Sequence, residues 1–271
     1  MTKGEIGSAI ERAAFALNSQ RPGEAERIVA EALKIDPRDT RALHIFGCAL
    51  LMQGRIAEAV APLEAAARDR HDPELDIQLA AALQQAGRID DALSRLRRAI
   101  KRQPPYPKAF YELGCALASM KRYAEAVEIF SRGRDIAPMV AEFSIQIGRA
   151  FLEQRAFADA KRAFACALEI SPAAHDALSG MALAHEGSGE YDKAADHFRR
   201  GLAAKSDPDT WLNLGRCLLR LGQFDEGCEC FRFAVRNAPT RYGKALGMLS
   251  KSARGRFWLK PSAAARFFQA E

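Results

Sequence analysis

The chain has 271 residues, 48% of them hydrophobic, and a formal net charge of +6, a composition that is normal for a folded chain. No apolar run approaches the ~18 residues of a membrane-spanning helix. Residues 1–20 include Glu5, Glu11 and Arg12 and therefore lack the uninterrupted apolar core of a signal peptide. We expect a cytoplasmic protein whose six cysteines are reduced and hold neither a disulfide nor a metal.

Small residues recur along the chain every 33 or 34 positions. Such a period is typical of stacked repeats that form one elongated body, because a single repeat cannot bury its apolar face alone. The first series is Ala25, Ala59, Ala92, Ala126, Ala160, Ala194 and Gly227, and the second, in the same phase, is Ala13, Gly47, Ala80, Gly114, Gly148, Ala182 and Gly215.

Each period divides into two amphipathic helices joined by a turn. In residues 107–140, apolar side chains at the spacing of a buried helical face predict helices over about 108–120 and 124–136. Pro138 ends the second helix. About seven repeats of this kind cover residues 1–239, starting near residues 6, 40, 73, 107, 141, 175 and 208.

The periodic pattern ends after residue 239. Residues 240–252 predict a single helix without a partner, which would cap the stack. Residues 253–271 form a basic, aromatic tail. Because residues 240–271 contain seven lysines and arginines and one acidic residue, they carry the whole net charge and leave the repeats neutral.

The repeats resemble the tetratricopeptide repeat (TPR), a 34-residue helix–turn–helix, and residues 208–239 show this best. Their family signature comprises Trp211, Leu214, Gly215, Leu218, Phe224, Phe231, Ala234 and Pro239. The resemblance implies an all-α fold: a right-handed superhelical solenoid of TPR helix–turn–helix repeats with a C-terminal capping helix. It also implies a concave groove, lined by the first helix of each repeat, in which a protein or peptide partner binds.

The resemblance places the fifth, sixth and ninth residues of each repeat at this groove. The candidate contact residues are His44, Ile77, Tyr111, Ile145, Arg149, Leu212, Asn213 and Arg216. Two interpretations stay open. The groove takes an apolar or amphipathic segment while Arg149 and Arg216 engage acidic groups, or the isoleucines at the fifth position serve only to pack the helices.

We find no pattern that predicts chemistry. The five histidines have no partner at metal-ligand or catalytic-triad spacing, and no glycine-rich phosphate loop or nucleophile motif is present. The sequence therefore predicts a protein that is not an enzyme and uses no cofactor and no metal.

The tail is the second candidate for a contact surface. Its basic and aromatic residues are Arg254, Arg256, Phe257, Trp258, Lys260, Arg266, Phe267 and Phe268. Three interpretations remain: the tail folds back over the end of the stack, it binds an acidic partner protein, or it binds an anionic membrane surface or nucleic acid. Nucleic acid is the least favoured partner, because the neutral repeats offer no extended basic face.

The sequence thus favours a non-enzymatic scaffold or adaptor that binds a peptide or partner helix in its groove. One alternative is a regulatory or recruitment protein that acts through its tail on an acidic partner or a membrane surface. Another is a companion module of a separate transferase. Self-association through the end helices is also open.

Overall fold

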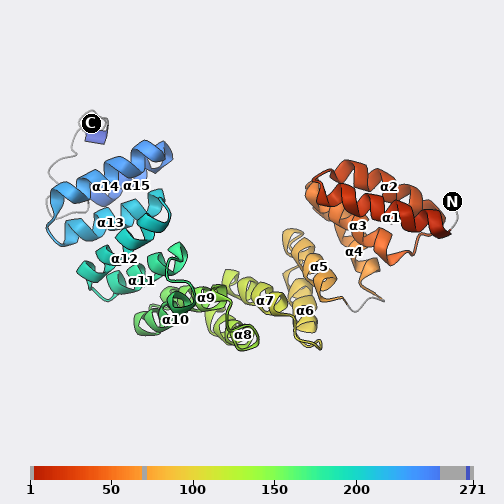
Figure 1. The fold of residues 1–271 in the computed structure, drawn as a ribbon, viewed down its shortest axis with the longest axis horizontal. Coiled ribbons are helices and arrows are strands. Elements are labelled where there is room, and N and C mark those ends of the chain that lie inside the picture. Colours follow the sequence, from red (N-terminus) through yellow and green to blue (C-terminus); the bar gives the residue numbers. More distant parts are fainter. Residues whose placement is uncertain (1–2, 69–71, 251–266, 269–271) are drawn as a thin grey trace. The chain divides into compact units, whose positions relative to one another are not determined.

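The computed structural model describes residues 3–68, 72–250 and 267–268 (Figure 1). Every regular element in these ranges is a helix, so the predicted all-α fold of consecutive helix pairs is confirmed. Two compact units divide the chain, Met1–Ser119 (unit 1) and Met120–Glu271 (unit 2). The boundary falls between the two helices of the repeat predicted to start near residue 107.

Unit 1 contains helices that pack in sequential pairs, α1 with α2, α3 with α4 and α5 with α6, followed by α7. Their bounds are α1 (Lys3–Asn18), α2 (Pro22–Ile35), α3 (Thr40–Met52), α4 (Ile56–Ala66), α5 (Pro73–Gln85), α6 (Ile89–Ala99) and α7 (Pro107–Ser119).

Unit 2 begins with α8, which packs against α9, and continues in pairs, α9 with α10, α11 with α12 and α13 with α14. A short 3-10 turn then leads into α15. The bounds are α8 (Tyr123–Ile136), α9 (Ala141–Glu153), α10 (Phe157–Ile170), α11 (His175–Gly187), α12 (Tyr191–Ala204), α13 (Pro208–Arg220), α14 (Phe224–Asn237), η1 (Pro239–Arg241) and α15 (Tyr242–Ser250).

The turn between paired helices requires one residue in the left-handed backbone region. Gly54 and Gly87 supply it in unit 1, with φ of 75° and 78°, at no steric cost because glycine has no Cβ. The same conformation at Arg155 (φ 58°) shows that the turn geometry also holds where the residue is not glycine. The period in the sequence therefore fixes a turn as well as two helices.

Aromatic rings fill the space that glycines leave between neighbouring helices. In unit 2 the fully buried ring of Phe164 on α10 lies against Gly148 on α9 and Gly180 on α11. A Cβ built at Gly148 would lie 2.7 Å from two ring carbons of Phe164, and one at Gly180 would come closer still. The ring thus occupies the space that a side chain at either glycine would need, as close packing of a core requires.

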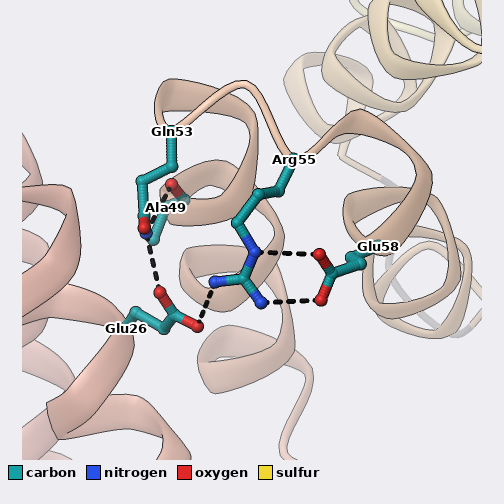
Figure 2. A network of polar contacts seen from close by, with 5 residues as sticks. All are labelled: Glu26, Ala49, Gln53, Arg55 and Glu58. Atoms are coloured by element: carbon teal, nitrogen blue, oxygen red, sulfur yellow. Dashed lines mark hydrogen bonds and ion pairs between the residues drawn. The ribbon is translucent and has the colours of Figure 1, made fainter.

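Charged residues join successive pairs at the turns. In unit 1, the guanidinium of Arg55 donates a hydrogen bond to each carboxylate oxygen of Glu58 (Figure 2). It also donates a hydrogen bond of 2.7 Å to Glu26 on α2, and Glu26 accepts a further one from Gln53. In unit 2 the same two repeat positions hold Glu190 and Lys161, 2.7 Å apart. The same two repeat positions therefore form an ion pair in both units, but the acidic and the basic residue have changed places.

Candidate functional site

The first helices of unit 1 present a polar surface rather than an apolar one. We call the part of it made by α3, α5 and α7 the unit 1 face. The amide oxygen of Gln78 on α5 accepts a hydrogen bond from Cys48 Sγ at 2.9 Å and contacts His44 Nε2, both from α3. All three side chains are half-buried, so they are held in place and still reach the surface.

Glu74 links α5 to the start of α7 on the same face. Its carboxylate accepts from Lys108 Nζ at 2.7 Å and from the hydroxyl of Tyr106 at 2.8 Å. Burial favours the neutral carboxyl, but the hydrogen bonds from Lys108 and Tyr106 outweigh it and lower the pKa of Glu74. Tyr111 lies half-buried on α7, one turn from Lys108.

The first helices of unit 2 carry ion pairs between neighbours, and we call the surface of α9, α11 and α13 the unit 2 face. Arg149 on α9 pairs with Asp176 on α11 at 3.0 Å. Arg216 on α13 donates two hydrogen bonds of 2.6 Å to Glu186 on α11. The arginines predicted to engage acidic groups therefore already do so within the chain.

Three of the predicted groove residues are buried, which corrects the interpretation of them as surface contacts. The exposed fractions are 6% for Ile77, 7% for Ile145 and 0% for Leu212. Their side chains pack between helices, so for these three the packing interpretation applies. His44, Tyr111 and Asn213 remain half-buried at the surface.

The partners Asp176 and Glu186 were missed by reasoning from the sequence. A signal existed, because each acidic residue lies 27 or 30 positions from its arginine, close to one repeat. Side chains one repeat apart on first helices are neighbours in a stack. A search for opposite charges at this separation would have found both pairs.

Two residues of the tail are described, and both contact the last helices. Phe268 is 5% exposed and meets the ring of Tyr242 edge-on at 5.0 Å. Phe267 lies under the guanidinium of Arg232, 4.4 Å from its ring centre. These contacts agree with the fold-back interpretation for this pair. Six predicted tail contacts lie outside the described residues: Arg254, Arg256, Phe257, Trp258, Lys260 and Arg266.

Burial disfavours chemistry at three of the cysteines. It raises the pKa of the Cys48 thiol to about 11 and those of Cys217 and Cys230 to about 12, which keeps them protonated and weakly nucleophilic. Within the residues that the structure describes, no group of three or more His, Cys, Asp or Glu side chains is placed to hold a metal ion. Nor is any described helix long and apolar enough to cross a membrane.

Comparison with known families gives one consistent result. Two family models described as tetratricopeptide repeat match the chain, one over residues 12–73, 77–139 and 145–209 and the other over 208–241. A relative from Mycosarcoma maydis, the small glutamine-rich tetratricopeptide repeat-containing protein 2, is 30% identical over 117 residues. That match covers 43% of this chain and 31% of the relative, so less than a third of the relative's length is represented.

Solved structures show the same fold at low sequence identity. The C-terminal part of a TPR repeat-containing protein from Cytophaga hutchinsonii aligns with a TM-score of 0.73 and 11% identity, over 89% of this chain and 99% of that one. YrrB, described as a TPR protein with an unusual peptide-binding site, aligns with a TM-score of 0.54 and 16% identity, over 67% of this chain and 94% of that one.

Proposed function

Since this chain belongs to the tetratricopeptide repeat family, we propose that it is a protein-interaction scaffold that binds a peptide or a partner helix on its first-helix faces. The observation that carries this proposal is the unit 1 face, where polar side chains of three successive first helices are held in hydrogen bonds at the surface. YrrB, with its peptide-binding site, supports it by likeness of fold.

The unit 1 face suits a peptide because it offers both donors and acceptors at fixed positions. Gln78 contributes an amide whose oxygen is occupied and whose NH₂ group, which also hydrogen-bonds Glu74, has a second N–H as a donor. Tyr111 adds an amphipathic ring, a side chain that binds well at low entropic cost. A preorganised polar surface of this kind reduces the free energy lost on binding.

The unit 2 face contributes an exposed ion pair in which an acidic group of a partner can replace the acidic residue. Arg149 and Asp176 are both exposed, with 47% and 59% of their side chains accessible, and exposed ion pairs are weak. An acidic group of a partner can therefore replace Asp176 at little cost. Asn213, half-buried on α13, adds an amide beside the firmly held Arg216.

Site-specific photo-crosslinking tests the proposal. A benzoylphenylalanine placed at Tyr111 or Asn213 should capture a protein partner in the native cell, whereas one at Glu128 or Asp192, exposed on second helices, should not. Mass spectrometry of the products identifies the partner and the linked residue. Capture from the second helices alone would contradict the proposal.

Two substitutions, one on a first helix and one on a second helix, provide a further test with its control. Tyr111→Glu should reduce capture by a probe at His44, because both residues belong to the unit 1 face. Glu128→Lys changes charge on the opposite helix set and should leave capture unchanged. If Tyr111→Glu behaves like the unmodified chain, the unit 1 face is not the binding surface.

The finer predictions remain proposals. Three concern the protein as a whole: a cytoplasmic location, the lack of enzymatic activity, and self-association through the end helices. Two are alternative functions: action of the tail on an acidic partner or a membrane, and a role as a companion module of a separate transferase. The photo-crosslinked products bear on several of them, since the identity of the partner distinguishes a transferase from another copy of this chain.

A further inference from the structure

A pocket of about 550 Å³ opens between α12, α13 and α14 in unit 2. Its walls are mostly apolar, and they include the tilted pair of Trp211 and Phe233, whose ring centres are 4.5 Å apart. Phe233 is 41% exposed. The remaining apolar walls are Leu202, Ala203, Leu214, Leu218 and Cys230.

The repeat period shows that Phe233 is unusual at its position. The equivalent residue of the other repeats is polar or small: Glu31, Ala65, Arg98, Arg132, Cys166 and Arg200. The aromatic ring is therefore not required by the fold of a repeat. An exposed aromatic side chain beside an apolar pocket is instead typical of a surface that something covers.

The rim of the pocket is acidic on balance. Arg199 pairs with Glu226 at 3.2 Å, and Glu229 adds a second carboxylate. An occupant that suits these walls and this rim has large apolar side chains flanked by basic ones. Residues 256–260 of this chain, Arg-Phe-Trp-Leu-Lys, have that chemistry.

We propose that the pocket binds the segment Arg256–Lys260 of the same chain. Phe257 or Trp258 fills the space against Trp211 and Phe233, and the ammonium group of Lys260 pairs with a rim carboxylate. The binding covers the exposed aromatic ring and fastens the tail to the outer side of α14.

The length of the chain allows this placement. Phe267 lies against Arg232 on α14, the residue that precedes Phe233. Lys260 is seven residues earlier, and seven extended residues span about 23 Å. A helix with its side chains is only about 10–12 Å across, so the segment reaches from the Arg232 side of α14 to the pocket.

Zero-length carboxyl–amine coupling tests the proposal on the full chain. The carbodiimide should join Lys260 to Glu226 or Glu229, and the peptide pair is identified by mass spectrometry. Lys244 and Asp209, 2.6 Å apart, provide an internal positive control. Formation of the control product without a Lys260 product overturns the proposal.

A mixture of ¹⁴N- and ¹⁵N-labelled chains distinguishes the source of the segment. Products of a single isotope support binding within one chain. Products that join the two isotopes show that a second copy supplies the segment, and they overturn the intramolecular proposal.

The variant Phe233→Arg provides a matched test, because three other repeats carry arginine at this position and fold. It should reduce the yield of the Lys260 product about tenfold, the effect expected when an aromatic contact is lost. Phe15→Arg, which changes an exposed aromatic side chain of α1 in unit 1, should leave the yield unchanged. An unchanged yield in Phe233→Arg overturns the assignment of the pocket.

Discussion

Arg216 and Glu186 form a two-pronged ion pair, with both hydrogen bonds 2.6 Å long, between α13 and α11. Only 14% of the Glu186 side chain is accessible. The pair therefore stabilises the stacking of two successive first helices and positions a guanidinium at the unit 2 face. A residue predicted to contact a partner thus has a structural role in the stack.

Replacing Arg216 with methionine should destabilise unit 2 by about 2 kcal/mol, because it leaves a poorly accessible carboxylate without its charged donor. Arg149→Met is the matched control. Its pair with Asp176 is longer and exposed on both sides, so the loss should be under about 1 kcal/mol. Urea denaturation followed by circular dichroism measures both, and equal losses would contradict the distinction.

Gly180→Ala should destabilise the chain by about 2 kcal/mol, because the new methyl group would overlap the ring of Phe164 in a filled core. The second change Phe164→Leu should recover part of the loss by making room. Gly7→Ala, on α1 where an added Cβ meets nothing within 4 Å, should instead stabilise by about 0.5 kcal/mol. Thermal unfolding of the three variants checks the signs.

Asp76 is the buried acidic centre of an ion-pair network in unit 1. It is 1% exposed and accepts from Arg98 at 2.5 Å and from Arg102 at 2.6 Å. Asp76→Ala should cost about 3 kcal/mol, since it leaves the poorly accessible Arg102 unpaired. Arg98→Ala should cost less, because Arg102 still pairs with Asp76. Denaturant unfolding of both variants orders them, and the reverse order would contradict this account.

Glu190 should give the protein a distinct acid dependence. Hydrogen bonds from Lys161, Lys193 and His185 lower its pKa from 4.5 to about 2. Because the folded pKa is below the unfolded one, the stabilisation is fully present above about pH 4.5 and is lost as the pH falls through about 2. The melting temperature of the unmodified chain should therefore exceed that of Glu190→Gln by a constant margin at neutral pH, and the margin should shrink in this window.

Lys161→Met tests the cause of that shift. Removing the first of the three donors should raise the pKa of Glu190 toward 4.5 and move the acid transition to higher pH. A carboxylate titration followed by NMR reports the pKa directly. An unchanged titration in the variant would show that Lys161 does not hold the carboxylate.

Position in the period was enough to predict the helices and the small residues such as Gly148, against which the ring of Phe164 packs. These features depend on contacts within one repeat or with the next, and the sequence repeats the residues that make them. Exposure was harder to predict. Ile145 and Leu212 share a repeat position with Tyr111, yet the first two are buried while the tyrosine reaches the surface.

The sequence by itself determined the repeat, its two helices and its family, because helical periodicity and the small-to-large complementarity of the core are local properties. Only the tertiary structure decided that Arg216 is held by Glu186, that Phe268 is buried beside Tyr242, and that Phe233 borders a pocket. Each of these depends on which side chains a neighbouring repeat or the tail brings within a few ångströms. The packing of helices against one another sets these distances, whereas the sequence shows only the spacing of residues along each helix.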